Sequence, residues 1–237
     1  MRKLSLISAV TLISLGCMVY ELSLAQLCTI MLGGVILRYS ITIGLFLSGL
    51  GIGAFLIKFL NDKSSLRALL FTELNLLFIG GLSPILMTWT DFALRRFAAE
   101  NIEMRLLLLQ TIQYALTLII GTLAGFELPI LMNLAEELDL ISSGKVLAFD
   151  YLGTVIGICV FGYVLFPNLG IVGASAAASV ANSLAIVLLL WAARSKINYQ
   201  AQIIISIVAL LFFATVAVRS EAISEYLIQN YYLSDLK

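Results

Sequence analysis

The chain has 237 residues, of which 61% are apolar and only 12% are charged, roughly half the charged share of a typical soluble domain. Its 14 basic and 14 acidic residues balance, so the sequence indicates no basic surface for a nucleic-acid partner. Histidine is absent, which removes the usual ligand of zinc, copper and haem and the commonest general base. This composition favours a membrane protein without a metal centre or another cofactor.

Seven apolar segments follow one another along the chain, each near the roughly 20 residues that a membrane-spanning helix needs. In chain order they cover residues 4–31, 40–60, 66–88, 104–133, 146–166, 170–193 and 201–218. Residues 91–103 mix charge with apolar side chains, which predicts a short helix lying at the membrane interface. Pro167 to Gly170 predicts a tight turn that makes the fifth and sixth segments an antiparallel hairpin.

These segments predict an all-α fold, a polytopic transmembrane helix bundle of about seven spanning helices. We expect residues 1–218 to form the bundle and residues 219–237 to form a short amphipathic C-terminal tail. The lipid bilayer is then the first partner, and a bacterial inner (cytoplasmic) membrane is the expected location. The three cysteines fall inside predicted spans, so we expect neither a disulfide framework nor a metal site.

Small residues recur at four-residue spacing within several segments. They form three GxxxG pairs, Gly49 with Gly53, Gly121 with Gly125 and Gly153 with Gly157, and a stripe of Gly170, Ala174, Ala178 and Asn182. Helices in a membrane associate by close backbone approach, which small side chains allow. The pattern therefore predicts helix-packing positions in a compact bundle and carries no information about chemistry.

Four acidic residues lie within the predicted spans, and the basic residues within the same bounds, Lys58, Arg67 and Arg105, lie at span ends rather than inside to pair with them. They are Glu21, Glu73, Glu127 and Asp150. An acid at the bilayer centre costs roughly 2.5–3.5 kcal/mol on insertion scales, so it usually faces the protein interior or a wet cavity. At about 1.5 Å of rise per residue, Glu73, Glu127 and Asp150 fall at similar depth in one leaflet, whereas Glu21 lies nearer the opposite face.

Glu127 comes just before Pro129, which removes one helical hydrogen bond and is expected to kink or break the fourth helix. Broken helices that carry acids are a common way to build a cation site at membrane depth. The resulting hypothesis is a cation site formed by Glu73, Glu127 and Asp150, with Glu21 as an additional intramembrane acid. An alternative stays open, in which each acid is neutral or hydrogen-bonded to a polar neighbour and has a structural role.

Several stretches of the chain form a recognisable set. They are residues 16–22 and 40–53, Glu73 in the third segment, the Gly-x-Glu-x-Pro element at 125–129, and residues 146–157 and 166–170. Together, over approximately residues 10–195, they resemble the membrane module of bacterial membrane-bound spermidine synthases. In the fused members these helices precede a soluble aminopropyltransferase domain, which has a Rossmann-like fold and takes decarboxylated S-adenosylmethionine and putrescine. This sequence stops at Lys237 without a Gly-rich nucleotide loop, so the resemblance implies no catalytic residue here.

Several functions remain open at this point. The favoured one is a non-catalytic membrane subunit, an anchor or scaffold for a partner enzyme or a larger membrane complex. The second is a channel or transporter for a cation or polyamine, in which the intramembrane carboxylates bind ammonium groups. The third is a fragment of a fused membrane spermidine synthase. Because histidine, a buried lysine and a serine–base pair are all missing, we expect the chain not to be an enzyme.

Overall fold

The computed structural model describes residues 1–59, 65–97, 101–193 and 200–227. These residues are helical with no strand, which confirms the prediction of an all-α fold. The helices are, in order, α1 (Arg2–Leu32), α2 (Val35–Leu56), α3 (Ser65–Phe97), α4 (Ile102–Glu137), α5 (Ser143–Val160), α6 (Phe166–Ala193), α7 (Gln200–Val218) and α8 (Ser220–Leu227). A short 3-10 helix, Ile57–Phe59, extends α2, and a π-helical segment, Phe161–Leu165, joins α5 to α6.

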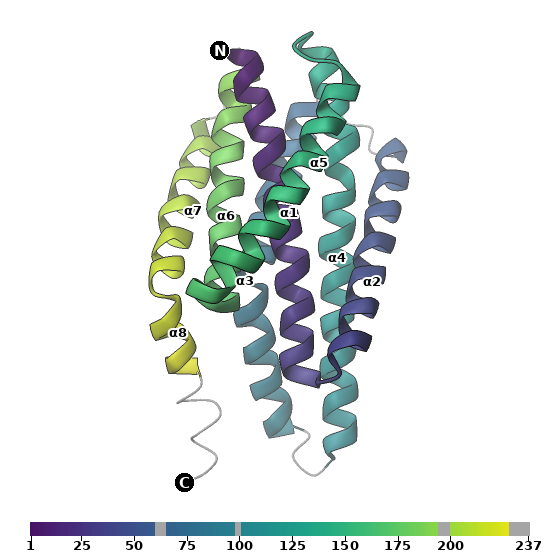
Figure 1. Ribbon diagram of the computed structural model, residues 1–237, viewed down its shortest axis with the longest axis vertical. Helices are drawn as coiled ribbons and strands as arrows, with labels where there is room; N and C mark the ends of the chain where they lie inside the picture. Colours follow the sequence, from purple (N-terminus) through teal and green to yellow (C-terminus); the bar gives the residue numbers. More distant parts are fainter. Residues whose placement is uncertain (60–64, 98–100, 194–199, 228–237) are drawn as a thin grey trace.

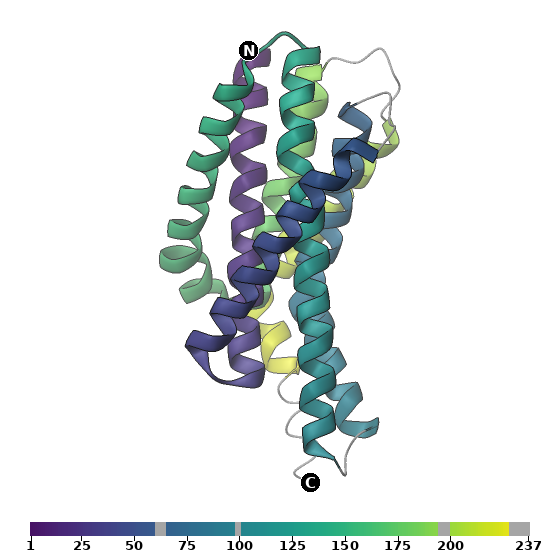
Figure 2. The same ribbon diagram turned by 90° about the vertical axis from the view of Figure 1, so that its right-hand side faces the viewer.

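Helix α1 is the central element of the bundle (Figure 1). It packs against α2, α3, α4, α5 and α6, so most of its circumference faces other helices. Its side chains are correspondingly small or apolar at the contacts, as with the fully buried Ala9, Ile13 and Leu24. The N-terminus lies at one end of the bundle and α8 lies toward the other end (Figures 1 and 2).

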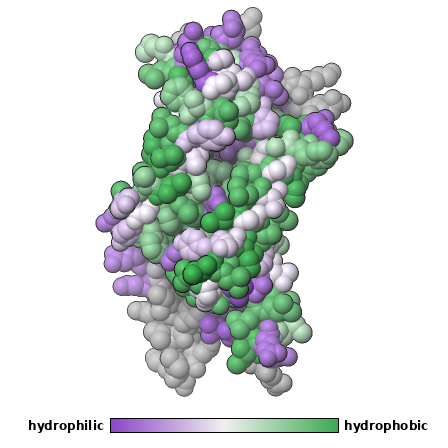
Figure 3. All heavy atoms as spheres, turned by 45° about the vertical axis from the view of Figure 1, so that its right-hand side comes forward, coloured by the Kyte–Doolittle hydropathy of each residue, from purple (hydrophilic) through white to green (hydrophobic). Residues whose placement is uncertain are grey.

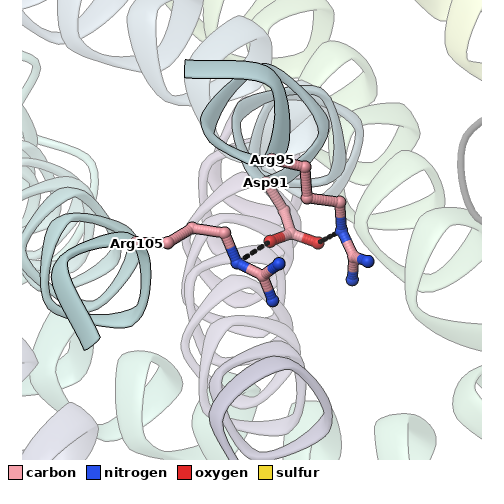
Figure 4. Close-up of polar contacts among 3 residues, drawn as sticks. All are labelled: Asp91, Arg95 and Arg105. Atoms are coloured by element: carbon pink, nitrogen blue, oxygen red, sulfur yellow. Dashed lines mark hydrogen bonds and ion pairs between the residues drawn. The ribbon is translucent and has the colours of Figure 1, made fainter. Parts of the chain in front are cut away.

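The third helix is longer than the sequence predicts. Helix α3 continues without a break through Asp91 to Phe97, so the expected separate interfacial helix over residues 91–97 is wrong, and residues 98–100 lie outside the described residues. Asp91 is buried, and its carboxylate lies 3.0 Å from Arg95 Nε and 3.9 Å from Arg105 Nε of α4 (Figure 4). A charge that is paired inside the bundle does not force the chain out of it.

Six helical runs of the described residues are long and apolar enough to cross a membrane, one fewer than predicted. The difference arises because the fifth and sixth predicted spans lie in a single run, Ser143–Ala193. The chain nevertheless reverses direction within that run, since α5 and α6 point opposite ways (Figures 1 and 2). At Gly170 the backbone leaves the helical conformation, with a φ of 64° that favours glycine. Each of the two helices packs chiefly on α1 rather than forming a simple hairpin.

The contact between α2 and α4 depends on paired glycines. Gly49 and Gly53 of α2 face Gly121 and Gly125 of α4 across a very short backbone separation. A Cβ atom added at Gly53 would lie 2.1 Å from the carbonyl oxygen of Thr122 and 2.8 Å from the Cα of Gly125. The obstructing atoms belong to the backbone, so they cannot move aside as a flexible side chain would.

Helix α5 approaches α1 in the same manner. A Cβ at Gly153 would lie 2.4 Å from the carbonyl oxygen of Thr11, and one at Gly157 would lie 2.9 Å from that of Leu15. All three GxxxG pairs therefore lie where another helix backbone leaves no room for a side chain, as expected for helices that associate in lipid.

Proline residues inside α3 and α4 do not break these helices. Helix α4 runs as one helix through Pro129, so the break considered from the sequence is not found there. In α3, Pro84 leaves the carbonyl of Gly80 without its usual helical donor, and the hydroxyl of Ser83 donates to that carbonyl at 2.7 Å. Such replacement bonds are how proline is tolerated in helices that lack contact with water.

Replacing Gly53 with alanine should destabilise the bundle by about 1–3 kcal/mol, because the new methyl group overlaps the α4 backbone. Gly51→Ala, two residues away, is the matched control, since a Cβ there meets nothing within 4 Å. The measurement is the thermal unfolding midpoint of each purified variant in detergent. A Gly53→Ala protein that unfolds no earlier than Gly51→Ala would contradict the close α2–α4 contact.

Candidate functional site

The carboxyl groups of Glu73 and Glu127 meet inside the bundle. Glu73 lies on α3 and is fully buried, while Glu127 lies on α4 and is 5% exposed. The two groups lie close enough to interact with each other. Among the described residues neither carboxylate forms an ion pair with a lysine or arginine. Two acids therefore share one buried position without a cationic partner from the protein.

Asn182 of α6 completes this site. Its Nδ2 donates a hydrogen bond to Glu73 Oε2 at 3.2 Å, and its side chain is fully buried. The amide fits only because α1 carries glycine opposite it, since a Cβ at Gly16 would lie 2.2 Å from Asn182 Oδ1. The next residue of α1, Cys17, lies beside Glu127. Four helices, α1, α3, α4 and α6, thus enclose what we call the Glu73–Glu127 site.

Hydrogen-bond donors are in short supply at this site. Glu73 Oε1, Glu127 Oε1 and Asn182 Oδ1 are buried and have no partner within the described structure. When both glutamates are ionised, all three oxygens are acceptors only, and the amide donor among these residues, Asn182 Nδ2, is already bonded to Glu73. Buried polar groups in proteins are nearly always satisfied. The arrangement therefore suits a bound group that brings N–H or O–H donors.

The other two acids of the predicted spans lie in different surroundings. Asp150 of α5 is half-buried, accepts a hydrogen bond from the hydroxyl of Ser14, and is near enough for its charge to act on Glu127. Glu21 lies on α1 and is 5% exposed, and it is not among the described groups that act on Glu73 or Glu127. The structure thus brings Glu73 and Glu127 together, places Asp150 near them and leaves Glu21 apart. Cation binding by these acids stays a prediction.

A second polar contact, one turn along α6, ties α1 and α3 to that helix. The Tyr20 hydroxyl lies 2.9 Å from Ser179 Oγ, which donates to the carbonyl of Leu77 at 2.8 Å. Two glycines of α3 make room for these side chains. A Cβ at Gly80 would lie 2.9 Å from the Tyr20 ring, and one at Gly81 would lie 2.1 Å from Ser179 Oγ. The contact holds α1, α3 and α6 in register beside the carboxyl groups.

Sequence reasoning found the acids but missed these partners. Asn182 entered only as the last member of a small-residue stripe, and Tyr20 and Ser179 were not singled out. A usable signal was present, because Ser175, Ser179 and Asn182 recur at four- and three-residue spacing and therefore share one face of α6. Polar residues on one face of an otherwise apolar helix indicate an internal polar contact.

Comparison with known proteins gives named relatives, although no family model and no solved structure matches the chain. It is 33% identical to polyamine aminopropyltransferase 2 of Ralstonia nicotianae over 203 residues, which is 84% of this chain and 37% of that protein. It is 32% identical to the polyamine aminopropyltransferase of Oceanobacillus iheyensis over 192 residues, 79% of this chain and 35% of the relative. The polyamine aminopropyltransferase of Corynebacterium efficiens is 32% identical over 230 residues, which is 92% of this chain and 42% of that protein.

These relatives contradict the expectation that the chain is not an enzyme, because their names are those of enzymes. That expectation rested on the lack of histidine, buried lysine and a serine–base pair, which bears only on chemistry inside the helices of this chain. The chain spans 37% and 35% of the first two relatives described, so most of each relative lies outside the comparison. The similarity otherwise agrees with the resemblance to spermidine synthases.

Replacing Ser179 with alanine should lower the stability of the bundle by about 0.6 kcal/mol and by no more than about 1.7 kcal/mol, the average and the maximum measured for hydrogen bonds between membrane helices. The variant loses the bond to the Leu77 carbonyl and leaves the buried Tyr20 hydroxyl without its partner. Ser48→Ala is the control, since this exposed serine bonds only to Gly44 of its own helix. Denaturation in detergent by graded addition of a harsher detergent measures both. Equal stability of the two variants would mean that the Tyr20–Ser179 contact contributes nothing.

Proposed function

We propose that this chain is the membrane-spanning part of an enzyme of the polyamine aminopropyltransferase type. The observation that carries the proposal is that 84% of a chain built almost wholly of apolar helices matches 37% of such a transferase. In this function the bundle anchors the enzyme in the bilayer. The remaining sequence of such a protein, on the same polypeptide or as a partner subunit, transfers the aminopropyl group to a polyamine.

The surface of the bundle supports its place in a bilayer. Large apolar side chains point outward from the long helices, among them Phe71, Trp89 and Val208, which are 68%, 59% and 60% exposed. Figure 3 shows a mostly apolar surface over the middle of the molecule, with hydrophilic atoms gathered toward its ends. Soluble monomers rarely expose apolar patches of this extent. We therefore propose an integral protein of a bacterial inner membrane.

The path of the chain supports seven crossings. The six apolar runs include Ser143–Ala193, within which α5 and α6 run in opposite directions and account for two crossings (Figures 1 and 2). An odd number of crossings places Met1 and α8 on opposite sides of the membrane. Helix α8 turns Ser220 toward the bundle and exposes Glu221 and Glu225, which suits a short amphipathic helix at the second surface.

Transport of a cation is a second candidate function, and it requires a path as well as a binding site. One cavity of about 450 Å³ lies beside Asp91 and Pro84 at the end of the bundle where α1 finishes. Another of about 790 Å³ lies beside Lys3 and Glu136 at the opposite end. Neither cavity is lined by Glu73 or Glu127. Neither of these cavities therefore gives the two acids a path to an end of the bundle, so they do not support conduction.

An exchange between this chain and its relative tests the proposed function. The 203 residues of the Ralstonia nicotianae transferase that match this chain are replaced by the corresponding residues of this chain. We expect the exchanged protein to remain in membranes after alkaline carbonate washing and to keep aminopropyltransferase activity, because the bundle supplies the same anchor. Activity is measured as transfer of a labelled aminopropyl group to putrescine.

The unexchanged transferase is the control for both activity and washing. A protein that leaves the membrane in carbonate would overturn the membrane-spanning assignment. A protein that stays in the membrane but loses activity while its transferase segment still folds would overturn the assignment of this bundle to that type of enzyme.

A further inference from the structure

We propose that the Glu73–Glu127 site binds a primary ammonium group of a polyamine, with Asn182 as the third ligand. The choice of a polyamine rests on the proposed function, whereas the choice of a cationic donor rests on the site itself. The sequence predicted a cation site made of three acids at one depth. The structure changes its composition to two acids, Glu73 and Glu127, and the amide of Asn182.

The number and kind of unsatisfied atoms match an ammonium group. An alkylammonium has three N–H donors and no acceptor. The site offers three buried acceptor oxygens without partners, one each on Glu73, Glu127 and Asn182. The positive charge balances one carboxylate, and the second carboxyl remains neutral by keeping its proton. One ligand thus removes both the shortage of donors and the repulsion between two adjacent acids.

Metal cations leave more of the site unsatisfied than an ammonium group does. Protons are the competing occupants, because each protonated carboxyl group carries an O–H donor for the other acid or for Asn182 Oδ1. Magnesium and calcium take six to eight oxygen ligands, more than the three free oxygens present here. The described residues contain no group of histidine, cysteine, aspartate and glutamate side chains suited to a metal ion. Of the larger cations, an ammonium group is therefore the one whose donors fit, and the protection experiment below separates it from protons alone.

Asp150 provides a place for a second positive charge. It lies on α5, is near enough for its charge to act on Glu127 and is only half-buried, so it is both near the Glu73–Glu127 site and partly exposed. A polyamine carries several ammonium groups separated by methylene chains. One end then binds Glu73 and Glu127 while the next ammonium faces Asp150.

Equilibrium binding of radiolabelled spermidine to the purified full chain in detergent micelles tests the proposal. We expect saturable binding that weakens about tenfold or more in Glu73→Gln and in Glu127→Gln, since each removes a buried charge partner of the ammonium. Asp150→Asn should weaken binding by a smaller factor, because this acid is half-exposed and already accepts a bond from Ser14.

Glu21→Gln is the matched control, because it removes an equally buried acid that lies apart from the site. It should bind spermidine as the unaltered chain does. The proposal is overturned if the unaltered chain shows no saturable binding, if either glutamine variant at the site binds normally, or if Glu21→Gln weakens binding as much as they do.

A second measurement needs no variant and so does not depend on whether the variants fold. Dicyclohexylcarbodiimide modifies carboxyl groups in apolar surroundings, and mass spectrometry identifies the modified residue. Spermidine should slow modification of Glu73 and Glu127 and leave that of Glu21 unchanged. Equal modification with and without spermidine would show that the pair holds only a proton. That result would contradict the ammonium site. If the protein also stays in the membrane after carbonate washing, the proposed membrane function would still hold.

Discussion

The hydrogen bond from Asn182 to Glu73 joins α6 to α3 at the level where α1 and α4 also meet. Inside an apolar bundle a buried polar group finds no water, so the surrounding helices must be shaped to satisfy it. Glycine at Gly16 makes the space for the amide of Asn182, and Gly81 makes the space for Ser179. The same small residues therefore have two effects. They let the helices approach closely, and they leave space for the buried polar side chains.

Most of the fold could be predicted from the sequence, because apolar runs of spanning length need no tertiary information. The departures occur where contacts between helices decide the local structure. Charge among apolar residues at 91–103 predicted a separate interfacial helix, but Asp91 is paired with Arg95 and Arg105, and α3 continues to Phe97. Pro129 indicated a break, yet α4 passes through it, and the helical conformation is lost at Gly170 instead.

The candidate site was only partly predictable. Rise per residue gives the depth of an acid, which placed Glu73 near Glu127, but it does not give the direction in which each side chain points. The pairing of Glu73 with Asn182, and the separate bond from Ser14 to Asp150, depend on how the helices are rotated against each other. The resemblance to spermidine synthases was found from the sequence, but the expectation that the chain is not an enzyme was wrong. It considered only chemistry inside these helices, whereas the named relatives extend well beyond the stretch that this chain matches.

The central claim is that a bound ammonium group replaces a proton at two buried carboxyl groups and supplies the hydrogen-bond donors that they need when ionised. Infrared difference spectroscopy of the purified chain, recorded with and without spermidine, tests it directly because protonated carboxyl groups and carboxylates absorb at separate frequencies. Spermidine should convert part of the protonated carboxyl signal into carboxylate signal, and the Glu73→Gln, Glu127→Gln double variant should lose that change. Identical carboxyl spectra in the presence and absence of spermidine would contradict the account.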